Sequence, residues 1–373
     1  MNTSELQKIE LHDAFWRRAP LTRPLLSFQV GGDRFPYDKM RAARALMRHG
    51  LTITPDMVDV GSFAEQTEEE IAHYERNKRN LPGDMLRGVA PFGGIPWMEC
   101  LLGCGVMAME HSFVSVPCQK SPGEPGKLRL ENSPWLKKYV EFLETYERRF
   151  SGRYPVTETL MRGCLDVYGA IIGQENMVYA FYDAPDIAYA MLSRINELYV
   201  EMVKLTLKHS RPIAGGILHP YGLWTPGTVN QFQEDMCALV TPEQMAKFVV
   251  PIHNRMCAQF DINGMHTHPT SYHVMPQQLS VNRLNLVQAQ KDEGDPLIFD
   301  RIGVLQSIQR AGKCLHFGSD LSIDEIDALL DALDMRGLSL TVRVRNEDDA
   351  MALYEHICAV CAKNDRRSDK KWA

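Results

Sequence analysis

Two histidines in the segment Gly264–His273 (GMHTHPTSYH) have the residue type and the spacing to do chemistry. His266 and His268 are two positions apart, so on an extended strand both imidazoles face the same side. Such a pair could ligate zinc or a similar ion. It could equally act as a proton donor with an orienting partner, or be hydrogen-bonded at a strand end without a metal. The candidates for a third ligand are Glu99, Asp235, Asp320 or a substrate oxygen.

Carboxylates in two further segments could assist the histidines. In FGGIPWMECLLGCGV (92–106), Glu99 follows Trp97 in an apolar setting. A carboxyl group among apolar neighbours holds its proton more tightly and could act as an acid or base, although a Glu at a helix start can also make a local cap. In WTPGTVNQFQEDMCALVTPEQM (224–245), Gln233, Glu234 and Asp235 could bind a polar substrate or hold the histidines. The alternative is a solvated turn, which suits Glu234 better than Asp235.

The elements that must position these residues alternate between strands and helices. Short apolar runs bounded by turn residues predict strands, and longer amphipathic stretches predict helices. The alternation implies a parallel sheet, and seven or eight such units favour a closed (β/α)8 TIM barrel over a doubly wound open sheet. We expect one α/β domain over 1–373, with an N-terminal helical extension (1–22) and a flexible tail (365–373). The predicted strands are 25–30, 154–160, 214–219, 260–266, 284–289, 313–317 and 338–344, and the predicted helices are 185–210, 241–259, 296–311, 323–335 and 347–362.

In a barrel of this kind, reactive groups follow the carboxyl ends of the strands. This rule collects polar and imidazole side chains on one face of the molecule. The residues selected are His219, Tyr221 and Trp224; His266, His268 and His273; Gln290, Lys291 and Asp292; His316, Ser319 and Asp320; and Arg162 and Asp166.

Composition limits the class of protein. The chain is 45% hydrophobic and 24% charged, as in ordinary globular proteins, and its net charge of -6 argues against nucleic-acid binding. No run of about 20 apolar residues predicts a membrane span, and the polar N-terminus does not resemble a signal peptide. Nine scattered cysteines form no disulfide framework, so we expect a cytoplasmic protein. The sequence contains neither a GxSxG elbow nor a Walker loop.

Several motifs in order resemble the uroporphyrinogen decarboxylase superfamily, from about Arg23 to His356. They are IPWMECLLGC, GRYPVTETLMRGCLDVYGAIIG with the following DAPD, LWTPGTVNQFQED and GMHTH. The resemblance implies a (β/α)8 barrel. Decarboxylases of this superfamily place arginines where Gln29 and Asp33 stand here, and only Arg34 remains nearby. This difference argues against a tetrapyrrole with many carboxylates, which needs guanidinium partners.

The superfamily also contains corrinoid-dependent methyltransferases, some with a zinc site of the form His-x-Cys and a distant Cys. Here His268 replaces that Cys, and 340–345 contain no cysteine. The overall pattern resembles the branch that demethylates methyl ethers. The resemblance therefore implies transfer of a methyl group from a small methylated substrate, such as an aryl methyl ether, to Co(I) in a corrinoid protein docked over the barrel mouth. A homodimer is also expected by resemblance.

Such an enzyme must stabilise a leaving oxygen, by a protonated imidazole, a carboxylic acid or a Lewis-acid metal such as zinc. His266, His268, His219, Asp235 and Glu99 suit that task. We expect Trp97, Tyr221, Trp224, Met265 and Tyr272 to wall an aromatic-accepting pocket, and Arg162, Gln290, His316 and Asp320 to bind substrate. The alternatives are a decarboxylase or lyase that anchors a small carboxylate with Arg162 or Lys291, and a non-catalytic ligand-binding barrel.

Overall fold

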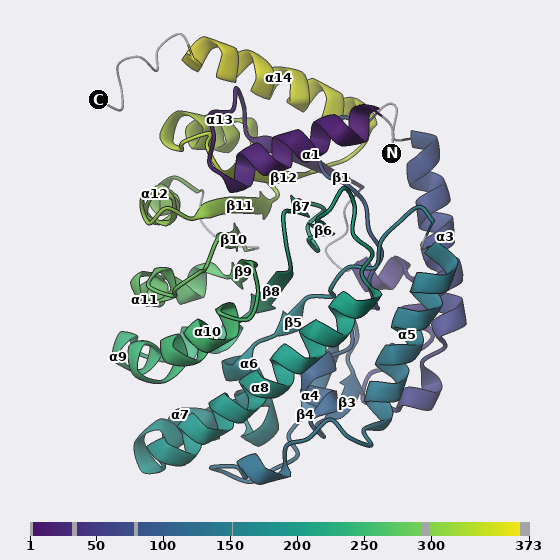
Figure 1. Ribbon diagram of the computed structural model, residues 1–373, viewed down its shortest axis with the longest axis vertical. Helices are drawn as coiled ribbons and strands as arrows, with labels where there is room; N and C mark the ends of the chain where they lie inside the picture. Colours follow the sequence, from purple (N-terminus) through teal and green to yellow (C-terminus); the bar gives the residue numbers. More distant parts are fainter. Residues whose placement is uncertain (1–2, 32–35, 78–80, 151, 293–297, 366–373) are drawn as a thin grey trace.

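A parallel sheet forms the centre of the computed structural model, which describes residues 3–31, 36–77, 81–150, 152–292 and 298–365 (Figure 1). Within these residues the sheet has seven strands in the order β1-β12-β11-β10-β9-β8-β5. Neighbouring strands are all parallel, as the strand–helix alternation predicts. The strands are β1 (Leu25–Val30), β5 (Met161–Arg162), β8 (Val229–Gln233), β9 (Ile262–Thr267), β10 (Leu286–Gln290), β11 (Cys314–Ser319) and β12 (Leu338–Val344).

An irregular segment, 84–89, closes the sheet between β1 and the residues that precede β5. The Asp84 amide donates to Leu26 O at 2.8 Å, and the Val89 amide donates to Pro155 O at 3.0 Å. The Thr157 amide returns a bond of 2.7 Å to Val89 O. The fold is therefore a TIM-barrel-like α/β fold, and the open sheet that we considered as an alternative is wrong.

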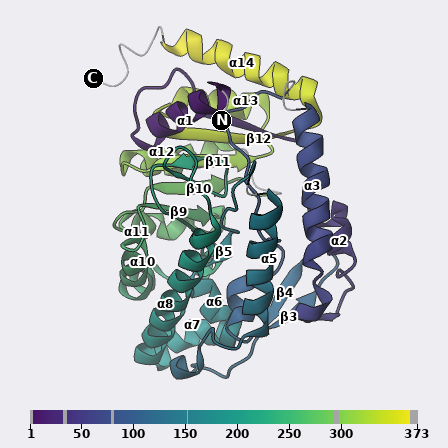
Figure 2. The same ribbon diagram turned by 45° about the vertical axis from the view of Figure 1, so that its right-hand side comes forward.

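Helices surround the barrel, with α3, α5 and α8 side by side along one flank (Figure 2). The outer ends of the long predicted helices are confirmed within one to three residues, apart from residues 296–297, which lie outside the described part. Residues 245–249 inside the predicted helix 241–259 are π-helical, and residues 298–301 form a 3-10 turn before the α-helix that starts at 302. Two of the predicted helices begin with a capping box, in which Thr241 pairs with Gln244 and Ser322 pairs with Glu325. The helices are α1 (Thr3–Trp16), α2 (Arg41–Arg44), α3 (Val60–Asn77), α4 (Trp97–Leu101), α5 (Pro134–Phe150), α6 (Cys164–Ile172), α7 (Gln174–Asp183), α8 (Pro185–His209), α9 (Pro242–Gln244), α10 (Val250–Cys257), α11 (Met275–Leu279), α12 (Ile302–Arg310), α13 (Ile323–Ala332) and α14 (Glu347–Asp365).

Two predicted barrel strands are wrong. Residues 154–160 form one isolated bridge, from Val156 to Val89, and the strand of that region is β5. Residues 217–218 (β6) pair antiparallel with Trp224–Thr225 (β7) in a hairpin, and the wall strand of this region is β8. The second error has a physical cause: Pro220 and Gly222 turn the chain back after β6, whereas β8 (VNQFQ) carries polar side chains toward the barrel interior and so lacks an apolar run. The remaining strands, β2 (Thr52–Ile53), β3 (Gly105–Ala108) and β4 (Phe113–Val116), form a separate antiparallel sheet.

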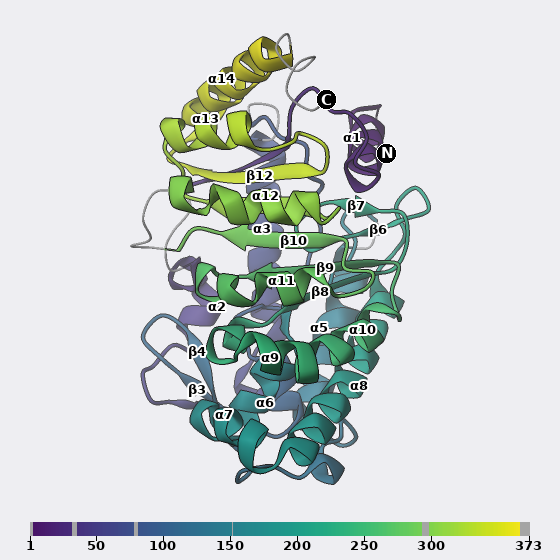
Figure 3. The ribbon, with the colours of Figure 1, turned by 90° about the vertical axis from the view of Figure 1, so that its left-hand side faces the viewer.

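Helix α1 and the β6–β7 hairpin lie at the amino-terminal ends of the barrel strands (Figure 3). Phe15 and Leu223 form a small core with Leu25, Leu286 and Cys314, which are the first residues of β1, β10 and β11. The carboxyl-terminal end of the barrel is therefore the open side. Residues 366–373, which we expected to form the flexible tail with Asp365, lie outside the described residues, and Asp365 itself ends α14.

None of the helices in the described residues combines the length and apolarity that crossing a membrane requires.

Candidate functional site

A row of polar side chains crosses the inner face of the sheet. In the strand register, His266 on β9 lies opposite Gln288 on β10, Gln288 lies opposite His316 on β11, and His316 lies opposite Ser339 on β12. The row faces a cavity of about 480 Å³ inside the barrel. The cavity is lined in part by Gln29, Tyr221, His266, Gln288, Gln290 and His316.

The two histidines of the GMHTH motif meet at their Nε2 atoms, which are 3.0 Å apart. Nδ1 of His266 contacts Oε1 of Gln288, and Nδ1 of His268 lies 2.8 and 3.0 Å from the two carboxylate oxygens of Asp292. These oxygens accept, so each Nδ1 carries the proton. Both Nε2 lone pairs therefore point at the same place, which calls for a proton or a cation between them. Histidine ligands of metals are held by outer acceptors in this way.

Asp235 completes a set of three ligand atoms. Its Oδ1 is shielded from solvent, makes no hydrogen bond and lies 3.5 Å from His268 Nε2. The ligand atoms of Asp235, His266 and His268 all lie within 4.8 Å of one another. Two imidazoles and one carboxylate suit zinc and leave a position open for substrate. Among the third ligands that the sequence suggested, Asp235 is the protein residue that the structure places with the pair.

The backbone around Asp235 is fixed by two buried carboxyl groups. Asp166, in the first turn of α6, accepts the amides of Asp235 (3.0 Å) and Met236 (2.7 Å). Glu234 accepts the Leu165 and Asp166 amides, each at 3.1 Å, and bonds His253 at 2.8 Å. Glu234 is thus a fully buried helix cap, and the solvated turn considered for it is wrong. Burial, with the nearby carboxylates of Glu234 and Asp235, raises the pKa of Asp166 well above its usual range.

Glu99 is paired with a cation at the same end of the barrel. It lies on α4, is 1% exposed and accepts a hydrogen bond of 2.7 Å from Nη1 of Arg162, at the end of β5. The purely apolar setting expected for this carboxyl group is therefore wrong. Arg162 and Asp235 together line a second hollow, of about 500 Å³, beside α6. Glu99 thus contacts Arg162, and Arg162 lines the same hollow as Asp235, which lies beside the histidine pair.

Buried imidazoles in the barrel are held neutral. Burial, with His316 nearby, lowers the pKa of His219 to about 3, and burial, with His266 nearby, lowers the pKa of His316 to about 4. Burial also lowers the pKa of His266. His219 lies beneath the cavity rather than on its wall: Nδ1 accepts the Tyr221 amide at 3.1 Å and Nε2 lies 3.0 Å from Gln231 Oε1. The described lining residues do not include it.

Tyr221 reaches the cavity from the hairpin at the amino-terminal end. Its hydroxyl donates to Gln288 Oε1 at 3.2 Å, and its ring stacks on His316 with centroids 5.0 Å apart. The Gln288 amide nitrogen donates to Ala289 O at 3.1 Å, which leaves Oε1 directed at Tyr221 and His266. Tyr221 therefore helps to orient the acceptor that sets the protonation of the His266 ring.

The aromatic wall predicted from sequence does not form, since Tyr221 is the one member of that set among the described lining residues. Trp97 packs in the core against Tyr139, with ring centroids 4.9 Å apart. Met265 is buried in the main core on the outward face of β9, because neighbouring strand residues face opposite sides. Trp224 lies at the amino-terminal end, where its carbonyl accepts Trp16 Nε1 at 2.7 Å.

Three other residues predicted for the site do not line the cavity. Tyr272 lies in the turn after β9, with the Arg301 guanidinium 6.0 Å from its ring centroid. Asp320 is at the surface and pairs with Arg343 at 3.1 Å. Lys291, the anchor considered for a lyase, pairs instead with Glu325 at 2.7 Å.

Sequence reasoning missed several residues of the site, namely Gln288, Thr341 and Arg343, and gave Asp292 no role. Gln288 could have been found, because it is two positions before Gln290 and so shares its face of β10. Likewise, Thr341 and Arg343 share a face of the predicted strand 338–344.

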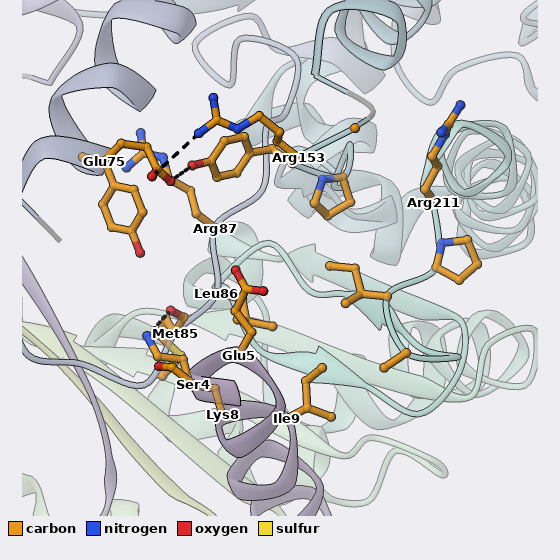
Figure 4. Close-up of a pocket in the computed structure, with 17 residues that line it drawn as sticks. Ser4, Glu5, Lys8, Ile9, Glu75, Met85, Leu86, Arg87, Arg153 and Arg211 are labelled. Atoms are coloured by element: carbon orange, nitrogen blue, oxygen red, sulfur yellow. Dashed lines mark hydrogen bonds and ion pairs between the residues drawn. The ribbon is translucent and has the colours of Figure 1, made fainter. Parts of the chain in front are cut away.

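A wider cleft, of about 1000 Å³, lies between α1, the end of α3 and the loop at 211–214 (Figure 4). Glu5 and Lys8 on α1 face it from one side, and Arg211 lies on another (Figure 4). Its lining includes none of the site residues expected from the sequence. The smaller cavity inside the barrel, which is lined by His266 of the histidine pair, is therefore the candidate site.

Comparison with known proteins gives a similarity of fold. A solved structure described as a methyltransferase from Methanosarcina mazei matches with a TM-score of 0.60 at 12% sequence identity, and the match covers 97% of this chain and 98% of that chain. At this identity the likeness shows the fold alone. No family model matches the chain, and no curated protein matches its sequence.

Proposed function

We propose that this protein is a methyltransferase that moves a methyl group from a small methylated substrate to the cobalt of a corrinoid carried by a partner protein. The observation that carries the proposal is the convergence of the His266 and His268 Nε2 atoms with Asp235 Oδ1 at the open end of the barrel. The similar solved structure, named as a methyltransferase, supports it. The corrinoid partner is proposed because the sequence motifs resemble those of corrinoid-dependent methyltransferases.

His266, His268 and Asp235 would hold a zinc ion, which when bound supplies a Lewis acid for the leaving oxygen of the substrate. Gln288 and Asp292 keep both rings in the Nδ1–H form, so the Nε2 lone pairs stay available. His316, neutral at physiological pH, hydrogen-bonds at the cavity wall and supplies no proton. The cavity separates the bound substrate from bulk water, and the partner would dock over the carboxyl-terminal mouth.

Metal analysis is the first test. We expect about one zinc per chain, with loss of zinc in His266→Ala, His268→Ala and Asp235→Ala. His273→Ala is the matched control, because His273 lies in the turn after β9 but bonds Val240 O (2.9 Å) and should leave the zinc in place. Full zinc in all three variants would remove the ligand assignment.

Methyl transfer is the second test. Purified protein is mixed with a reduced corrinoid protein and candidate methyl donors, and methyl-cobalt absorbance is recorded. We expect absorbance to rise with the wild type and not with His266→Ala. Release of carbon dioxide from a small carboxylate without corrinoid, and no methyl-cobalt with any donor, would favour a lyase and reject the proposal.

A further inference from the structure

The polar groups that line the cavity inside the barrel, among the described residues, carry no negative charge. Its wall includes the hydroxyl groups of Ser27 and Thr341 and the side-chain amides of Gln29 and Gln290. Tyr221 is the one phenol or other large aromatic ring among the described lining residues, and His316 covers one of its faces. Such a wall favours a ligand with several oxygen atoms over a flat aromatic ligand.

The charge of the lining favours an anion. The described lining residues include two arginines and no aspartate or glutamate. The Arg87 guanidinium is directed away, over the Tyr74 ring at 5.0 Å and 3.9 Å from Glu70. Among the described lining residues, Arg343, near the end of β12, is therefore the cation that serves the cavity.

Arg343 can accept a second anionic partner. Its Nη1 bonds Asp320 at 3.1 Å, and the two side chains are 41% and 73% exposed. Exposed ion pairs of this kind are weak, and a guanidinium offers five N–H donors in a planar fork that fits a carboxylate. A carboxylate entering the mouth would thus find donors on Arg343.

The position of Arg343 sets the direction of a ligand. Strands β10 and β11 separate β12 from β9, so Arg343 and His266 lie on different sides of the carboxyl-terminal mouth. A ligand whose anionic end contacts Arg343 extends its other end across the cavity toward the histidine pair. A volume of about 480 Å³ suits a small molecule.

We propose that the methyl donor is a small aliphatic carboxylate with its methyl group on an ether oxygen, with the carboxylate on Arg343 and the ether oxygen toward His266 and His268. This inference rests on the proposed methyltransferase function and names its substrate class. Among the described lining residues, Tyr221 is the one large aromatic ring on which an aryl ether could stack, and no carboxylate is present to hold a quaternary ammonium donor.

Calorimetric binding to the zinc-loaded protein, without the corrinoid partner, tests the substrate class. The probes are methoxyacetate, its uncharged amide, anisole and glycine betaine. We expect methoxyacetate to bind at least about tenfold more tightly than the amide, because a charge-assisted bond to Arg343 is lost in the amide. Arg343→Gln should abolish this preference. Arg345→Gln is the matched control, since Arg345 follows two residues later, is 88% exposed and pairs with Asp349.

Four results would each overturn the inference. They are equal affinity for the acid and the amide, tighter binding of anisole or betaine, no binding of methoxyacetate at millimolar concentration, and a preference for the acid that persists in Arg343→Gln. The two proposals fail separately. Methyl transfer from uncharged donors only would reject the carboxylate and keep the methyltransferase. Carboxylate-selective binding with no methyl transfer to any corrinoid protein would reject the methyltransferase and leave the anion site standing.

Discussion

Glu158 allows a quantitative test of how the barrel wall is built. It lies in the segment that leads into β5, is 1% exposed, and accepts the Gln231 amide at 3.0 Å and the Tyr199 hydroxyl at 3.4 Å. Burial raises the pKa of Glu158 from 4.5 to about 8. Replacement by Gln keeps the shape and removes the titration. Its single carbonyl oxygen can take the place of only one of the two carboxylate oxygens, and Tyr199 retains its bond of 2.9 Å to Asn230 Oδ1.

The folded protein holds the Glu158 proton up to about pH 8, whereas the unfolded chain releases it near pH 4.5. The stabilisation is therefore complete below the unfolded pKa and is lost as the pH rises through the folded pKa. Since one pKa unit corresponds to about 1.4 kcal/mol, the wild type should lose about 2 kcal/mol of this contribution between pH 6 and pH 8.

Urea unfolding at pH 6, 7 and 8 measures the effect. The free energy of unfolding of the wild type, minus that of Glu158→Gln, should fall by about 2 kcal/mol over this range. Glu131→Gln, at an exposed position, is the control and should follow the wild type at every pH. A constant difference between wild type and Glu158→Gln would refute the assignment of a buried, protonated carboxyl group at this position.

Three further predictions concern other parts of the molecule. Asp292→Asn should weaken zinc binding about 10- to 100-fold in chelator competition, because the Nδ1 proton of His268 then bonds to a neutral amide oxygen in place of a carboxylate. Unchanged affinity would argue against a metal at the pair. Gly222→Ala should lower the free energy of unfolding in urea by about 3 kcal/mol, and Gly215→Ala should lower it by about 1 kcal/mol. Both glycines have φ near +80°, but only a Cβ at 222 meets a backbone carbonyl. Equal losses in the two variants would contradict this reasoning. Cys118 is exposed, and the Cys104 thiol, 3.7 Å away, lowers its pKa. Peptide mapping should therefore find Cys118 as the first cysteine modified by maleimide. Earlier labelling of a buried cysteine would count against this prediction.

The wall of the barrel was predictable where the outward side of a strand is wholly apolar. The segments 25–30 and 338–344 match β1 and β12 residue for residue, and their outward residues are leucine, phenylalanine or valine. Strand β8 was not predictable in this way, because Asn230 interrupts its outward side as well as Gln231 and Gln233 its inward side. A strand with polar residues on both sides thus gives no apolar alternation to detect.

The site was predictable where one motif carried it. His266 and His268 share one side of β9 because of their spacing, and the structure brings their rings together. Gln288 lies on β10 and Asp292 just after it, so spacing could place Gln288 on the inner face, but only the register of β9 and β10 shows that it bonds His266. The prediction of an aromatic wall was wrong for a related reason. It was based on residue type, whereas the side of the strand or helix on which a ring lies decides whether that ring reaches the cavity.

The floor of the barrel has a consequence for how the protein is handled and varied. Trp16 on α1 bonds the Trp224 carbonyl, and the same hairpin presents Tyr221 to Gln288, which contacts His266. Helix α1 is thus connected to the histidine pair by a short series of hydrogen bonds and backbone links through the molecule's interior. Shortening or tagging the beginning of the chain would be expected to alter ligand affinity at the distant rim even when the rim itself is untouched.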